Sequence, residues 1–199
     1  LWGAGGALRT VHRHASDALV LTMLIHGLRY FAFDRLRGFR WFSWVSGVAL
    51  IWLAYVAGVN GYMLPWDRLA QFVTQASFEW LDWLPGFGGT LIRNVILPEH
   101  VSNRLFSLLV FIHIGVPLLM LLVMWIHVQR VPKASTQPPR PIALALVLML
   151  LVLAVATPVA SQGPADLHSA PAVLALDWFL LTIFPLLYAW PLGTVWGLV

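Results

Sequence analysis

The sequence contains no cysteine, and only 10% of its 199 residues are charged. Without cysteine, the chain cannot form disulfides, thiolate metal sites, cysteine-ligated iron–sulfur clusters or covalent bonds to c-type haem. Soluble domains carry charge on about a quarter of their residues, whereas this chain is 60% hydrophobic. The composition therefore excludes a water-soluble globular protein and predicts a protein embedded in membrane lipid.

Five apolar stretches are long enough to cross a hydrocarbon core about 30 Å thick, which takes about 20 helical residues. They are 15–33, 41–64, 105–128, 142–160 and 173–198. The segment 65–104 is too polar to span, and its aromatic residues favour amphipathic helices at the membrane interface over an ordinary extramembrane loop. The predicted fold class is therefore an all-α integral membrane protein with about five transmembrane helices.

Prolines and basic residues mark the organisation of the chain. The proline-rich run 131–141 predicts a linker between residues 1–130 and a two-helix C-terminal unit, 142–199. Lys and Arg gather around this linker and in the loop 34–40, and the positive-inside rule places both loops in the cytoplasm. The net charge of +4 therefore reflects membrane topology, and no nucleic-acid partner is expected.

Four histidines follow a repeated spacing in the first and third predicted spans. His12 and His26 are 14 residues apart, and so are His113 and His127. At about 100° per residue, 14 steps end about 40° short of four full turns, so each pair shares one helix face about 21 Å apart. Two such helices packed side by side present two facing histidine pairs, one near each membrane surface.

This arrangement predicts a four-helix-bundle-like core that holds two non-covalent b-type haems with bis-histidine ligation. Neutral imidazole is a good axial ligand of haem iron, and two facing helices can hold both sides of a porphyrin. A lone membrane histidine can simply bond to a backbone carbonyl. The same spacing on two helices favours ligation, because ionisable groups inside a membrane are costly and usually functional.

Arginines and glycines flank the expected ligands. Arg9 precedes the first ligand of its span by three residues, and Arg29 follows the second by three. A guanidinium at these positions can pair with a haem propionate, although Arg29 has the alternative of snorkelling to the interface. Gly47 and Gly61 of the second span are also 14 residues apart. They let a flat ring approach the backbone, although glycine also serves helix packing alone.

Three stretches carry more specific motifs. They are Leu8–Ser16 with His26-Gly27-Leu28-Arg29; Gly61-Tyr62-Met63-Leu64-Pro65-Trp66; and Arg104-Leu105-Phe106-Ser107 with His113, Pro117 and His127. Together they resemble three consecutive transmembrane helices of cytochrome b from the bc-type, quinol-oxidising respiratory and photosynthetic complexes. The resemblance implies a lower-potential outer haem on His12 and His113, and a higher-potential haem on His26 and His127 on the cytoplasmic side.

A fourth stretch, Leu176-Asp177-Trp178-Phe179, is similar to the Pro-Glu-Trp-Tyr element of the same family. In the family, this carboxylate accepts a proton from quinol at the outer oxidation site. The resemblance therefore implies an outer quinol site that includes Asp177, Tyr62 and Trp66, and a carboxylate at the mouth of a span is chemically suited to that role. The alternative is that Asp177 only caps the N-terminus of the span.

The implied function is that of a haem-bearing subunit of an oxidoreductase, which oxidises quinol near the outer face and moves electrons across an energy-transducing membrane such as a bacterial inner membrane. Because the chain lacks cysteine, its electron acceptor must be another chain of the complex, by analogy a Rieske-type iron–sulfur protein or a c-type cytochrome. The chain begins at Leu1 and lacks some helices of the family, so we expect a longer protein or a completing partner.

Two other functions are compatible with parts of this pattern. One is a dihaem, quinone-reducing membrane anchor of a dehydrogenase or hydrogenase, against which the elements at Trp66 and Asp177 argue. The other is a haem-free transporter or assembly subunit, which leaves the repeated histidine spacing unexplained.

Overall fold

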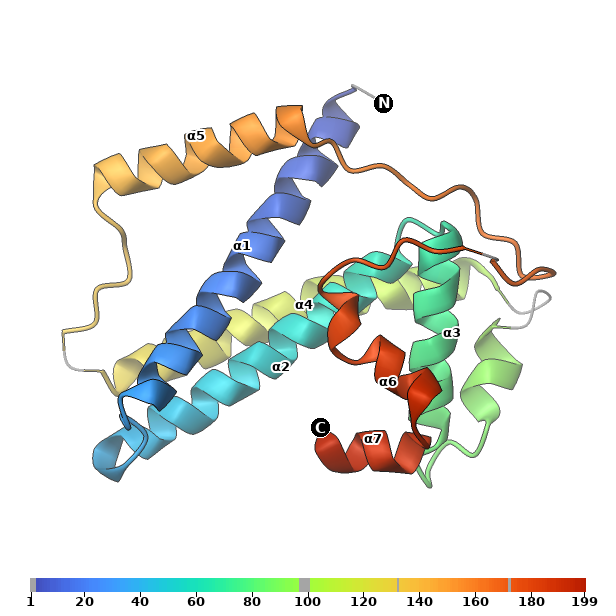
Figure 1. The fold of residues 1–199 in the computed structure, drawn as a ribbon, viewed down its shortest axis with the longest axis horizontal. Coiled ribbons are helices and arrows are strands. Elements are labelled where there is room, and N and C mark those ends of the chain that lie inside the picture. Colours follow the sequence, from blue (N-terminus) through green and yellow to red (C-terminus); the bar gives the residue numbers. More distant parts are fainter. Residues whose placement is uncertain (1–2, 97–100, 132, 172) are drawn as a thin grey trace. The chain divides into compact units, whose positions relative to one another are not determined.

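The structure is a computed structural model that describes residues 3–96, 101–131, 133–171 and 173–199. Within these ranges the regular elements are α1 (Ala4–Ala32), η1 (Gly38–Arg40), α2 (Trp41–Met63), α3 (Arg68–Asp82), η2 (Ile92–Ile96), α4 (Asn103–Gln129), α5 (Arg140–Ala156), η3 (Leu180–Thr182), α6 (Phe184–Ala189) and α7 (Leu192–Leu198) (Figure 1). All of them are helical, as the composition predicts. The chain forms two compact units, Leu1–Val56 with Val116–Ala160 and Ala57–Gly115 with Ser161–Val199.

Two helical stretches in the described part of the chain are long and apolar enough to cross a membrane. They are Gly38–Met63, which joins η1 to α2, and Asn103–Gln129, which is α4. Both coincide with predicted spans. The helix α1 begins at Ala4 rather than at residue 15, so it carries Arg9 and His12 as well as the predicted apolar stretch. The helix α5 is apolar but shorter than predicted, because it ends at Ala156.

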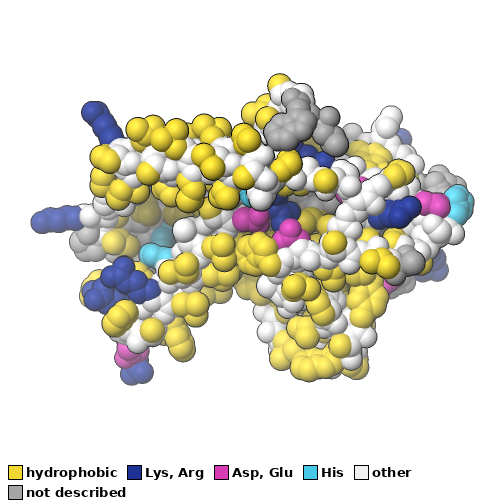
Figure 2. All heavy atoms as spheres, turned by 45° about the horizontal axis from the view of Figure 1, so that its top comes forward, with side chains coloured by type: hydrophobic (Ala, Val, Ile, Leu, Met, Phe, Trp, Pro, Cys, Tyr) yellow, Lys and Arg dark blue, Asp and Glu magenta, His cyan; other side chains and the backbone are white. Residues whose placement is uncertain are grey.

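Large apolar side chains lie on the surface of the long helices. Phe111 of α4 is 74% exposed and Val152 of α5 is 67% exposed, and Figure 2 shows hydrophobic side chains over much of the visible surface. Contiguous apolar surface of this kind is unusual on proteins that face water. Helices suit the lipid interior because they satisfy their backbone hydrogen bonds internally, so these faces fit an integral membrane protein.

The predicted fifth span, 173–198, is not a single helix in the structure. Its residues form η3, α6 and α7, and Trp190 between the two α-helices has an extended backbone. Pro185 lies in the first turn of α6 and Pro191 is the N-cap of α7. Proline lacks a backbone N–H and clashes with the preceding turn, so it starts helices and interrupts them. The apolar composition of this stretch therefore serves packing between short helices.

In the first unit, α1 packs against α5 and the chain that follows it. His14 Nε2 lies 3.0 Å from the carbonyl oxygen of Thr157, just after the last residue of α5. Thr10 Oγ1 donates to the carbonyl of Gly6 and accepts from the backbone N–H of Val159. Polar side chains of α1 thus satisfy backbone groups where α5 ends, as buried helix termini require.

In the second unit, α3 is amphipathic and packs against α6. Its buried residues are Leu69, Ala70, Gln71, Val73, Thr74, Ala76 and Ser77. The Phe72 ring lies 5.6 Å from that of Tyr188 and 6.0 Å from that of Phe184, both in α6. The segment 65–104 therefore contains an amphipathic helix as predicted, and its apolar face is covered by the C-terminal part of the chain.

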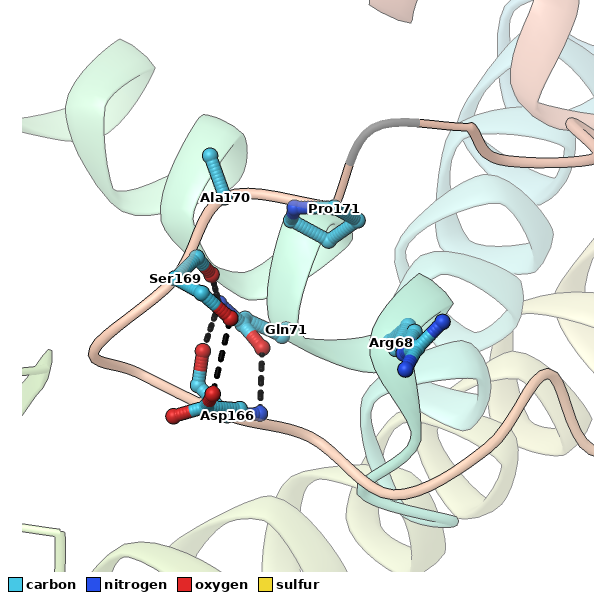
Figure 3. A pocket seen from close by; sticks show the side chains of 6 residues that line it. All are labelled: Arg68, Gln71, Asp166, Ser169, Ala170 and Pro171. Carbon is cyan, nitrogen blue, oxygen red and sulfur yellow. Dashed lines mark hydrogen bonds between the residues drawn. The ribbon is translucent and has the colours of Figure 1, made fainter.

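Residues 161–171 are tied to the N-terminal end of α3 by hydrogen bonds (Figure 3). Gln71 pairs through its side-chain amide with the backbone N–H and carbonyl of Asp166, at 2.8 Å each, and also donates to the carbonyl of Ser169. A hydrogen bond from the Ser169 hydroxyl lowers the pKa of Asp166. These residues line an open cavity of about 240 Å³ together with Arg68, Ala170 and Pro171.

Asp67 joins the two elements, and its replacement gives a first testable prediction. One carboxylate oxygen accepts from the backbone N–H of Ala70 as the N-cap of α3, and the other accepts from the backbone N–H of Gln162. We expect Asp67→Ala to weaken this region by about 1 kcal/mol, a typical N-cap loss. Hydrogen–deuterium exchange should then show faster exchange at both amides.

The variant Asp67→Asn separates the two contacts. Its side-chain oxygen can still cap α3, but its NH₂ group cannot accept a hydrogen bond from Gln162. We expect the Ala70 amide to stay protected and the Gln162 amide to exchange faster. Unchanged exchange at Gln162 in both variants would contradict this role of Asp67.

Candidate functional site

His26 of α1 and His127 of α4 lie face to edge in the first unit. Their ring centroids are 6.5 Å apart and their planes are inclined by 66°. A metal–imidazole bond of about 2 Å places the centres of two rings on opposite sides of one metal ion about 6 Å apart. The separation of the two rings is therefore suitable for a single iron between them. The Tyr30 ring packs beside His26 at 4.8 Å.

A buried serine of α2 determines which nitrogen of His127 carries the proton. Ser46 Oγ donates to the carbonyl of Phe42 at 2.8 Å and lies 2.9 Å from His127 Nδ1. Because its hydrogen is directed to the backbone, Ser46 must accept from Nδ1–H. The lone pair of His127 is then on Nε2, and metal-bound histidines commonly donate their other ring N–H in this way.

His113 and His12 show the same preference by different contacts. His113 Nδ1 lies 3.1 Å from the carbonyl oxygen of Ala57, which can only accept, so Nδ1 carries the proton. His12 Nδ1 lies 3.3 Å from Ser16 Oγ, whose own hydrogen is donated to the carbonyl of His12. His12 belongs to the first unit and His113 to the second, and in both rings the lone pair is assigned to Nε2.

The two glycines of α2 lie against the histidine rings of α4. A Cβ atom added at Gly47 would lie 3.3 Å from Cε1 of His127, and one added at Gly61 would lie 2.8 Å from Cε1 of His113. The second distance is shorter than real Cβ contacts, so a side chain at Gly61 would displace the ring. The space beside each imidazole therefore depends on glycine, and the four histidines and two glycines fit the haem sites predicted from the sequence.

Arg9 and Arg29 lie on α1 about one turn from His12 and His26, with exposed side chains. Arg29 is in the last turn of the helix. Both positions suit the interface at which carboxylates of a bound group meet water.

The residues of the predicted quinol site lie in the second unit. Tyr62 stacks on Phe179 with ring centroids 5.9 Å apart and planes inclined by 16°. Asp177 Oδ1 accepts from the backbone N–H of Phe179, and the Asp177 carbonyl accepts from the N–H of Leu180 at the start of η3. Trp66 has a different neighbour, because its ring packs edge-on against Phe106 at 5.1 Å. Phe179 thus connects Tyr62 with Asp177.

Three residues near these sites were not identified from the sequence. Ser46 contacts His127, and Asn60 is only 5% exposed, with no hydrogen-bond partner for Oδ1 in the described part of the chain. Burial raises the pKa of the Glu79 carboxyl on α3. Serine and asparagine inside an apolar span are a signal that the sequence contains, since buried polar groups need partners.

The fold and these sites define an all-helical membrane protein with histidines arranged for metal ligation. A family model described as cytochrome b (N-terminal)/b6/petB matches residues 17–155. The chain belongs to this family, whose members are membrane electron-transport proteins that bind b-type haem, and the resemblance found in the sequence is confirmed.

Among curated proteins, cytochrome b6 of Chlamydomonas reinhardtii is 28% identical to this chain over 142 residues. The matched region covers 68% of this chain and 63% of the relative, so the chain spans less than two thirds of that protein. No solved structure matches the chain.

Proposed function

We propose that this chain is the haem-bearing part of a subunit that oxidises quinol near the outer membrane face and transfers electrons across the membrane through two b-type haems. The observation that carries the proposal is the approach of His26 and His127 from two helices to a ring separation of 6.5 Å. The matching 14-residue spacing of His12 and His113 from these residues extends the proposal to a second site.

The proteinaceous part of each site is assigned residue by residue. His26 and His127 hold the cytoplasmic-side haem through Nε2, and His12 and His113 hold the outer haem. Each bound haem supplies a one-electron carrier. Gly47 and Gly61 keep the space beside the ligands open, and Arg9 and Arg29 place cations where propionates meet the interface.

The outer quinol site is assigned to Tyr62, Trp66 and Asp177. The Tyr62 and Phe179 rings offer an apolar stacking surface, and the Asp177 carboxylate is suited to accept a proton. Asn60 adds a buried amide oxygen that can accept a hydrogen bond from a quinol hydroxyl. Oxidation of quinol releases protons and electrons together, so a proton acceptor in the same unit as His113 supports the assignment.

The remaining partners follow from what the chain lacks. Because it has no cysteine, the high-potential acceptor is assigned to another subunit, a Rieske-type iron–sulfur protein or a c-type cytochrome. The complex is placed in an energy-transducing membrane, such as a bacterial inner membrane, with the Arg-rich loops in the cytoplasm. A redox-titrated optical spectrum of the purified complex tests the proposal, which requires two b-type transitions; absence of a b-type band overturns it.

Replacement of Arg29 tests its role at the cytoplasmic-side site. Removing a cation beside a haem destabilises the more negative reduced state, so Arg29→Leu should lower one midpoint potential and leave haem content unchanged. Arg35→Leu, in the neighbouring loop, is the matched control. If both midpoint potentials in Arg29→Leu equal those of the parent, the arginine serves only the membrane interface.

A further inference from the structure

Helix α2 presents a hydrogen-bond acceptor and a glycine to each histidine of α4. Ser46 and Gly47 contact His127, while the Ala57 carbonyl and Gly61 contact His113. We propose that Ser46 is a positioning residue for His127, and that the exchange of a hydroxyl acceptor for a carbonyl acceptor contributes to the difference in potential between the two haems. This inference rests on the proposed function.

The Ser46 side chain is committed to this task by its surroundings. The residue is 8% exposed, and its hydroxyl is within hydrogen-bond distance of the carbonyls of Phe42 and Ser43 at 2.8 and 3.2 Å. These carbonyls of the preceding helical turn take the hydroxyl hydrogen, which leaves an oxygen lone pair for His127 Nδ1–H at 2.9 Å. The rotation of the ring about its Cβ–Cγ bond is therefore set from α2, an element other than the helix that carries it.

The adjacent glycine makes this contact possible. At Gly47 an added Cβ would come within 3.3 Å of Cε1 and 3.8 Å of Nδ1 of His127. The imidazole edge thus rests on the α2 backbone, one residue from the hydroxyl that binds it. Gly47 provides the space and Ser46 provides the direction.

The acceptors of the two α4 histidines differ in strength. A backbone carbonyl withdraws the Nδ1 proton more strongly than a hydroxyl, which gives the ring more imidazolate character and makes it a stronger donor to ferric iron. Stronger donation favours the oxidised state and lowers the potential. The carbonyl acts on His113 and the hydroxyl on His127, which is the order expected if the His113 haem has the lower potential.

The test compares Ser46→Ala with Ser46→Thr and Ser43→Ala in the purified, haem-loaded complex. Ser46→Ala removes the acceptor, Ser46→Thr retains a hydroxyl, and Ser43→Ala removes a hydroxyl one turn away while keeping its backbone carbonyl. The readouts are the two midpoint potentials, the electron paramagnetic resonance g-values of the ferric haems and the rate of haem loss to apomyoglobin. These readouts do not depend on quinol turnover.

We expect Ser46→Ala to raise the higher midpoint potential, to change the g-values of that haem alone and to speed its loss about tenfold, the lower end of the usual effect of removing a hydrogen bond to a metal ligand. Ser46→Thr and Ser43→Ala should match the parent. Parent potentials and g-values in Ser46→Ala, or equal shifts of both haems, overturn the inference.

The two proposals fail in different ways. If the parent complex contains no b-type haem, the proposed function is wrong. If the parent contains two haems but the higher-potential one is unaffected by Ser46→Ala, only the positioning role is wrong. If Ser46→Ala does not assemble, Ser46→Thr decides: parent properties support the hydroxyl, and changed properties overturn its role.

Discussion

Replacing His127 with leucine is expected to remove the cytoplasmic-side haem and so to halve the b-type haem content of the complex. Leucine has a similar volume but no lone pair, and a haem held by one remaining axial histidine loses most of its affinity. The ring of His26 would then face an apolar side chain in place of the imidazole now 6.5 Å away. A pyridine haemochrome assay gives the content, and a redox titration identifies the lost component.

Two further variants make this result specific. His113→Leu should remove the other haem and retain the component lost in His127→Leu. His14→Leu should retain both haems, because His14 bonds to the backbone carbonyl of Thr157 and is out of phase with His26. Unchanged haem content in His127→Leu, or loss of both haems in His14→Leu, would contradict the assignment of ligands.

The second large effect is expected at Asp177. We expect Asp177→Asn to slow quinol-dependent haem reduction at least tenfold, because positioned acid–base groups typically contribute about 10²–10⁴-fold. The haem spectrum and content should not change. The amide oxygen of asparagine can still accept from the N–H of Phe179, which Asp177 Oδ1 binds now. The variant therefore retains the local cap and removes only the carboxylate.

Stopped-flow reduction at several pH values measures this effect, and Glu79→Gln serves as the comparison. Burial raises the pKa of Glu79, so this carboxyl on α3 is the alternative proton acceptor of the second unit. Parent rates in Asp177→Asn would assign Asp177 to capping alone. If Glu79→Gln is the slow variant, the proton acceptor is on α3.

The helices α2 and α4 and the repeated histidine spacing could be predicted from the chain alone. A membrane-length apolar run and the 3.6-residue helical period are local properties, so the positions of Gly47, Gly61, His113 and His127 on their helices follow from counting. The motifs also indicated the family, because they are short and contiguous.

The stretch 173–198 shows the limit of that reasoning. Its apolar composition suits a spanning helix, yet Pro185 and Pro191 divide it into short helices, one of which packs on α3. Composition alone does not distinguish a side chain that faces lipid from one that faces another helix, since both environments are apolar.

The hydrogen bonds of the histidines were decided only by tertiary packing. Ser46 is 81 positions from His127 and Ala57 is 56 from His113 along the chain, so no local pattern connects them. Helical periodicity determines which face a histidine occupies, but the acceptor that meets its Nδ1 proton comes from a different helix. The register between α2 and α4 therefore selects which nitrogen of each ring carries the lone pair, and so which atom is available to bind iron.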